Sequence, residues 1–168
     1  KVELFAAEPK LASPVAIGLD EKNRVFVAEE YRFNLGTEEN RTRPFLLEDD
    51  LQIKTLDDRL KMYEKFASKF EGGMEWFRKV ADQVRLVEDT DGDGRYETSF
   101  VFADKLLFAT GVQPWKGGVI VTLAGRVAYL KDTDGDGKAD IRRKVFTGFH
   151  KFNVQAVVNN LRMGLDHK

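Results

Sequence analysis

A nine-residue acidic motif occurs twice and constrains the fold more than any other feature of the sequence. The first copy is Asp89-Thr-Asp-Gly-Asp-Gly-Arg-Tyr-Glu97, and the second, Asp132-Thr-Asp-Gly-Asp-Gly-Lys-Ala-Asp140, begins 43 residues later. Each copy has carboxylates at positions 1, 3, 5 and 9. Two carboxylates about 4 Å apart repel each other by roughly 4 kcal/mol at an effective dielectric constant near 20. A divalent cation reverses that repulsion, and calcium accepts six to eight oxygen ligands.

The motif shares its first half with the calcium loop of an EF-hand, but its second half differs. Phe100 and Arg143 stand where an EF-hand has its bidentate glutamate. The segments just upstream, residues 84–87 and 127–130, have the aliphatic and β-branched composition of strands. We therefore predict calcium loops at the tips of β-hairpins, which resemble the loops of integrin-type propeller blades. The alternative is that the Asp-Gly pairs only form good hairpin turns.

The predicted ligands are the four carboxylates of each copy, closed by the residue at position 9, together with the backbone carbonyl at position 7. They are Asp89, Asp91, Asp93, Arg95 and Glu97 in the first loop, and Asp132, Asp134, Asp136, Lys138 and Asp140 in the second. Calcium loops of millimolar affinity suit compartments in which calcium is abundant. We therefore expect a periplasmic or secreted protein.

Composition narrows the class of protein. The 168 residues correspond to one domain, and 42% of them are hydrophobic. The 27 basic and 28 acidic residues lack the basic excess of a nucleic-acid-binding protein. The sequence contains no run of about 18 apolar residues of the kind that spans a membrane. It has no cysteine, which excludes disulfides, thiolate zinc sites and covalent c-type haem within these residues.

A repeat of about 40–45 residues that contains several short strands is typical of β-propeller blades. Each acidic motif lies between the third and fourth of four predicted strands. The predicted strands are residues 14–19, 24–28, 84–87 and 98–102 in the first blade, and 110–115, 118–123, 126–130 and 141–146 in the second. We predict an all-β fold for residues 1–168, a partial β-propeller of about two four-stranded blades.

The first predicted blade carries an insertion, residues 32–82, that the second lacks. Within it, residues 56–71 place apolar side chains such as Leu60 and Phe70 at spacings of three and four, which indicates an amphipathic helix. Thr55 and Asp58 have the spacing of a capping box at its start.

Both ends of the sequence resemble parts of a blade. Residues 1–6 are similar to the predicted fourth strands, and we expect them to complete a last blade and close the ring. Residues 160–166 repeat the opening of the first blade, and we expect them to begin a third. Because a ring needs at least about four blades, we expect further blades outside this sequence.

Several of these segments resemble a bacterial family of membrane-bound dehydrogenases, many of which carry a C-terminal c-type haem module. The segments are residues 2–9, 24–29, 84–94, 101–104, 132–140 and 146–149. The N-terminal domain of that family is a propeller similar to the soluble quinoprotein glucose and sorbosone dehydrogenases. The resemblance implies oxidation of a sugar or alcohol by pyrroloquinoline quinone, with electrons passed to haem.

The sequence departs from the pattern of these relatives at the position of the catalytic base. In the quinoprotein relatives a histidine shortly precedes a Gly-x-Asp signature, which appears here as Gly164-Leu-Asp166. The place of the histidine falls on Ala156, and alanine cannot accept a proton. Two hypotheses therefore stay open: a quinone-dependent dehydrogenase domain, or a non-catalytic calcium-stabilised propeller that binds carbohydrate or protein.

Candidate substrate contacts lie in the loops expected at the mouth of the propeller channel. They are Tyr31, Arg32, Arg41, Gln155 and Asn159, whose side chains could hold a sugar or an anionic quinone. The alternative for the first three is a solvated loop whose charges pair with one another.

Overall fold

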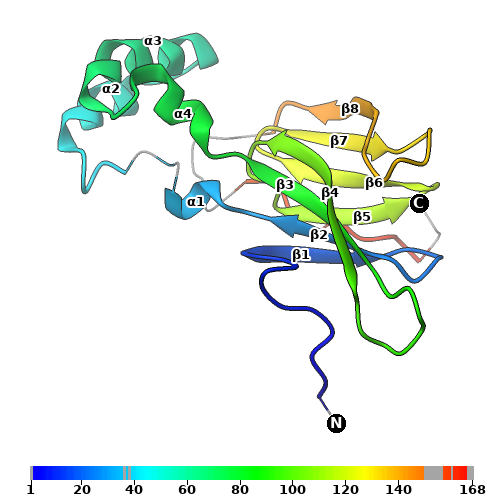
Figure 1. Ribbon diagram of the computed structural model, residues 1–168. Coiled ribbons are helices and arrows are strands. Elements are labelled where there is room, and N and C mark those ends of the chain that lie inside the picture. The colour runs from blue at the N-terminus through cyan, green and yellow to red at the C-terminus, as the bar shows by residue number, and fades with distance from the viewer. Residues whose placement is uncertain (1, 36, 38, 150–156, 160, 166–168) are drawn as a thin grey trace. The chain divides into compact units, whose positions relative to one another are not determined.

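The computed structural model describes residues 2–35, 37, 39–149, 157–159 and 161–165. The chain divides into two compact units (Figure 1). The β unit comprises residues 1–30 and 81–168, and the helical unit comprises residues 31–80. Among the described residues, no helix has both the length and the apolar character needed to cross a membrane.

The described part of the β unit is mostly strand and forms two antiparallel sheets of four strands each. Sheet A has the order β1-β2-β3-β4, and sheet B has the order β5-β6-β7-β8. The strands of sheet A are β1 (Pro14–Leu19), β2 (Val25–Glu29), β3 (Asp82–Glu88) and β4 (Thr98–Leu106), and those of sheet B are β5 (Gly111–Trp115), β6 (Gly118–Leu123), β7 (Arg126–Lys131) and β8 (Ile141–Thr147). All eight strands predicted between residues 14 and 146 are confirmed, with ends shifted by a few residues.

The main hydrophobic core lies between the two sheets. Sheet A contributes Phe26, Val84, Leu86 and Phe102, and sheet B contributes Val119, Val121, Leu123 and Leu130, all of them at most 3% exposed. These residues alternate along their strands because successive side chains of a strand point to opposite faces. Strands β1 and β5 approach so closely that a Cβ atom on Gly18 would lie 2.5 Å from Cδ of Pro114. The first strands of the two sheets therefore face each other directly.

The helical unit is built from short helices around an aromatic cluster. Its elements are α1 (Arg32–Leu35), η1 (Pro44–Leu46), α2 (Leu47–Gln52), α3 (Leu56–Phe66), η2 (Ala67–Lys69), η3 (Gly73–Glu75) and α4 (Trp76–Lys79). The predicted capping box is confirmed: Thr55 accepts a bond from the Asp58 amide, and the Asp58 carboxylate accepts one from the Thr55 amide. Buried Leu46, Met62, Phe70 and Phe77 form the centre of the cluster.

The predicted helix over residues 56–71 is too long, and its apolar stripe is partly wrong. The α-helix ends at Phe66 and continues as the 3-10 turn η2, and Phe70 has an extended backbone. Leu60 is 50% exposed, whereas Met62 is buried against Leu46 and Phe77. The face that a helix buries depends on where its neighbours lie, and the spacing of apolar residues does not fix that position.

The two terminal segments do not form the predicted strands within the described residues. Residues 2–13 contain no strand, and Val2 and Leu4 are 100% and 74% exposed. Residues 161–165 likewise lie outside any strand, and residues 160 and 166 are not described. A strand is defined by pairing with a neighbour, and the described chain pairs no strand with either segment.

Candidate metal centre

The two acidic motifs form hairpin loops at equivalent places in the two sheets. The first joins β3 to β4, and the second joins β7 to β8. The glycines at positions 4 and 6 have positive φ angles, 78° and 87° in the first loop and 81° and 85° in the second. Only glycine adopts such angles readily, so the motif's glycines allow the chain to curl its carboxylates inward. The predicted location at hairpin tips is confirmed.

The carboxylate at position 1 organises each loop by accepting two backbone hydrogen bonds. Asp89 accepts from the amides of Gly92 and Gly94 at 2.6 and 2.9 Å. Asp132 accepts from the amides of Gly135 and Gly137 at 2.7 and 2.9 Å. The two loops thus share a backbone path dictated by the same residue spacing.

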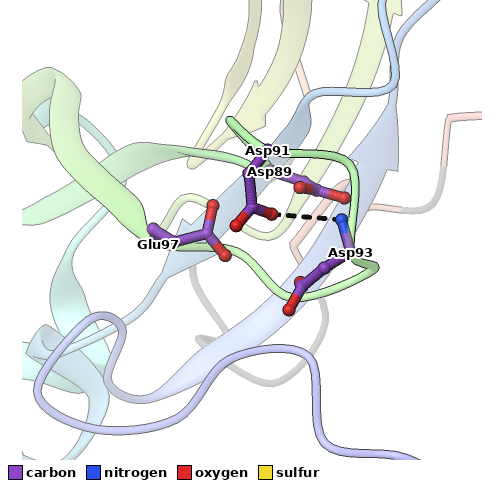
Figure 2. Close-up of side chains that lie close together, drawn as sticks. All are labelled: Asp89, Asp91, Asp93 and Glu97. Atoms are coloured by element: carbon purple, nitrogen blue, oxygen red, sulfur yellow. Dashed lines mark hydrogen bonds between the residues drawn. The ribbon is translucent and has the colours of Figure 1, made fainter.

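The carboxylates at positions 3 and 5 bind the backbone two residues ahead. Asp91 accepts from the Asp93 amide at 3.1 Å, which is the dashed line in Figure 2, and Asp93 accepts from the Arg95 amide at 2.7 Å. In the second loop, Asp136 accepts from the Lys138 amide at 2.7 Å. These bonds leave lone pairs on the carboxylate oxygens for a further ligand.

In the first loop, all four predicted carboxylates come together. Asp89, Asp91, Asp93 and Glu97 each offer an oxygen, and these oxygens lie within 4.8 Å of one another (Figure 2). Two ligands that each lie 2.3–2.6 Å from one calcium ion are at most about 5 Å apart. The first donor set therefore fits a calcium ion.

The second loop brings together three carboxylates. Asp132, Asp134 and Asp136 offer oxygens within the same 4.8 Å, and Asp140 is not in this group. Both oxygens of Asp140 accept bonds from Thr133, from its amide at 2.7 Å and from its hydroxyl at 2.9 Å. Glu97 makes the equivalent bonds to Thr90 through one oxygen, Oε2. The longer glutamate side chain thus reaches the other three carboxylates while it holds Thr90.

Hydrogen bonding within the loops lowers the pKa values of three carboxylates, those of Asp132, Asp140 and Glu97. The Gly135 amide is the main cause of the lowered pKa of Asp132. The Thr133 and Thr90 amides are the main causes of the lowered pKa values of Asp140 and Glu97. Metal ligands must be deprotonated, so the lowered pKa values favour the ionised form that a cation requires. A carboxylate with a lowered pKa is a poor proton acceptor at neutral pH, which does not suit general-base catalysis.

The predicted substrate contacts that the structure describes are divided between the two units. Arg32 is buried in the helical unit and donates to the carbonyls of Phe77 and Val80 at 2.8 and 3.2 Å. Arg41, in the same unit, is exposed and pairs with Glu39, as the solvated-loop alternative expects. Tyr31 belongs to the helical unit and Asn159 to the β unit. Gln155, like the Ala156 position, lies outside the described residues.

Sequence reasoning missed a buried ionic cluster around Glu29. Glu29 ends strand β2 and is a charged residue with 0% exposure. Its carboxylate accepts from Nε of Arg85 at 3.0 and 3.1 Å, from Gln83 at 2.5 Å and from the Ala12 amide at 2.7 Å. A buried charge is tolerated when it is paired and hydrogen-bonded in this way. A signal was available in the sequence. When the two repeats are aligned, Glu29 corresponds to Leu123, which is a core residue of sheet B.

Comparison with known families places the whole chain in one of them. A family described as "Domain of unknown function (DUF7133)" matches residues 1–168. The chain belongs to this family. No curated protein and no solved structure matches it.

Proposed function

We propose that this member of DUF7133 forms calcium-stabilised blades of a β-propeller. The observation that carries the proposal is the repeated loop. In each copy, the carboxylate at position 1 accepts backbone hydrogen bonds, and a group of carboxylate oxygens lies close enough together to share one calcium ion. Calcium would neutralise the mutual repulsion of these carboxylates and so hold the hairpin tips in one conformation.

The arrangement of the sheets supports the propeller part of the proposal. Each sheet is a simple up-and-down meander of four strands, and the two meanders follow each other in the chain. They pack face to face, with the first strand of one beside the first strand of the other. Successive blades of a propeller have this order, with first strands innermost. The remaining blades would then be supplied by other parts of the polypeptide.

For the complete protein we propose, from the sequence resemblance, an exported quinone-dependent dehydrogenase of a sugar or alcohol. Pyrroloquinoline quinone would carry the oxidation, and a c-type haem module would receive the electrons. The alanine at position 156 favours a second candidate, a propeller that binds carbohydrate or protein without chemistry. Turnover of a sugar panel with added quinone, calcium and an artificial electron acceptor distinguishes the two, because the second candidate predicts neither turnover nor a quinone spectral change.

The calcium proposal is tested by titrating chelator-treated protein in a calorimeter. We expect two sites with dissociation constants of about 10⁻⁴ to 10⁻³ M, the range of extracellular calcium modules. The variant D89N/D91N/D93N should lose one site, and D132N/D134N/D136N should lose the other. The control E48Q/E64Q/E71Q removes the same charge from exposed positions of the helical unit and should keep both sites.

Two results would overturn the calcium proposal. One is that the wild-type protein binds no calcium at millimolar concentrations. The other is that the two loop variants retain the wild-type stoichiometry. Magnesium serves as a selectivity control, since it demands octahedral geometry at shorter distances and should bind these flexible loops more weakly.

A further inference from the structure

The two acidic loops are anchored by the same backbone bond to different segments. At position 8 of the second loop, the Ala139 amide donates to the carbonyl of Phe102 in β4 at 2.8 Å. At position 8 of the first loop, the Tyr96 amide donates to the carbonyl of Phe5 at 3.1 Å. Phe5 lies in the N-terminal segment, which belongs to neither sheet. The N-terminal segment therefore has the same relation to sheet A that β4 has to sheet B. Strand β4 is itself the outermost strand of sheet A.

The side chains repeat the same relation. Phe102 and Ala103 of β4 belong to a core with Val119, Val121, Leu130 and Ala139 of sheet B. Phe5 and Ala6 pack against a smaller cluster on sheet A, whose members are Val25, Val27, Val87 and Tyr96. Strand pairing shows the equivalence, since Val25 pairs with Val87 as Val119 pairs with Leu130. The N-terminal segment thus covers the outer part of sheet A.

The inner part of the same face of sheet A is open. Over sheet B, the inner positions are covered by β1, β2 and β3, through residues such as Ala16, Phe26 and Leu86. Over sheet A, the residues Val15, Ile17 and Leu19 of β1 are 48%, 63% and 60% exposed. We call these three residues the β1 face.

The counterparts of the β1 face in sheet B are buried. Ile17 pairs with Val27 as Val112 pairs with Val121, and Leu19 pairs with Val25 as Pro114 pairs with Val119. Val112 is only 6% exposed, and Pro114 is buried beside Gly18 of sheet A. Equivalent positions therefore differ in exposure only because sheet A covers one set and nothing in the described chain covers the other.

We infer that the β1 face is a docking surface for three further strands of the same polypeptide, lying outside residues 1–168, which complete a four-stranded sheet with residues 3–6 as its outermost strand. The inference rests on the proposed propeller and continues the interface seen between sheets A and B. The inference predicts that the three docked strands present an apolar face to sheet A, and that the first of these strands lies beside β1.

The position of the N-terminal segment favours this occupant over a second copy of the chain. A docked sheet from another copy would bring four strands, including an outermost strand of its own. That strand would take the place already occupied by Phe5 and Ala6 on sheet A. A fourth docked strand would therefore compete with the N-terminal segment, whereas three strands would leave that segment in its place.

Site-specific photocrosslinking in the complete natural protein tests the inference. The photoreactive residue p-benzoylphenylalanine replaces Ile17, and in the control it replaces Leu51, which is 77% exposed in the helical unit. We expect irradiation to join position 17 to a peptide outside residues 1–168 within one polypeptide, at several times the yield obtained at position 51. Crosslinks only to residues 1–168, a product of doubled mass, or a yield no higher than the control would overturn the inference.

Hydrogen exchange on the complete protein provides a second measurement without the bulky probe. In the wild type we expect the amides of residues 4–6 to be protected as strand amides are. The variant I17K should speed their exchange at least tenfold, whereas L51K should leave it unchanged. Equal exchange in the two variants would also overturn the inference. Calcium titration of the same samples reports separately on the loops, so the docking inference can fail while the calcium proposal stands.

Discussion

The first and second acidic loops have nearly the same internal hydrogen bonds but different surroundings. The second is anchored on β4, inside the core shared by two sheets. The first is anchored on an N-terminal segment that belongs to no sheet. The comparison shows that local sequence sets the shape of a loop, whereas a segment distant in the sequence supplies its anchor.

The largest expected difference is in the stability lost when either of the two anchoring phenylalanines is truncated to alanine. Phe102 is 3% exposed and meets Phe26 edge to face with ring centroids 5.0 Å apart, so F102A should lower the free energy of unfolding by roughly 3–5 kcal/mol. Phe5 is partly buried against Tyr96, and F5A should cost only about 1–2 kcal/mol. Urea-induced unfolding measures both. Equal costs in the 168-residue chain would show that the two anchors are not different in strength.

The next difference concerns the ninth position of each loop. Glu97 joins the carboxylate group of the first loop, and Asp140 stands outside that of the second. We expect E97Q to weaken calcium binding at the first loop about tenfold, which corresponds to about 1.4 kcal/mol. D140N should weaken binding at the second loop by a smaller factor. Calorimetric titration of each variant, with the other loop inactivated by aspartate-to-asparagine changes, measures the two factors. A greater loss in D140N than in E97Q would contradict the geometry.

The smallest expected difference in stability comes from an ion pair beside the second loop, which has no counterpart at the equivalent position of the first repeat. Arg142 donates to the carboxylate of Asp104 at 3.0 Å and to its backbone carbonyl at 2.8 Å, so it links β8 to β4. At the equivalent position the first repeat has Ser99, which donates to the carbonyl of Lys10. Both charged side chains are about half exposed, and solvent screening limits the pair to at most about 1 kcal/mol.

This ion pair gives the contact between β8 and β4 a stabilisation that depends on pH. The bond from Arg142 is the main cause of the lowered pKa of Asp104. Because the folded-state pKa lies below the ordinary value of about 3.9, the stabilisation is present above about pH 4 and is lost as the pH falls through the folded-state pKa. D104N should therefore destabilise the chain slightly at pH 7, and this cost should disappear as the pH falls below the folded-state pKa of Asp104. A cost that persists in acid would show that Asp104 acts through packing and not through its charge.

Much of the β unit could be predicted from sequence because its signals are short-range. The strands follow from runs of β-branched and aliphatic residues, and the loops follow from the spacing of aspartates and glycines within nine residues. The capping box of α3 is equally local, since Thr55 and Asp58 lie three residues apart. Failures occurred where a long-range neighbour decides the outcome. Leu60 is half exposed and residues 2–6 form no strand, because burial and strand pairing depend on segments distant in sequence.

By itself, the sequence determined the repeated acidic hairpins, the eight strands and their antiparallel order. These features depend on bonds between residues a few positions apart or on adjacent strands joined by turns. Only the tertiary structure decided that Glu29 is buried against Arg85, 56 positions away, that Asp140 stands apart from its loop's other carboxylates, and that β4 and the N-terminal segment play the same part for different sheets. The physical reason is that burial and anchoring depend on atoms supplied by distant segments, and no local pattern records which segment will supply them.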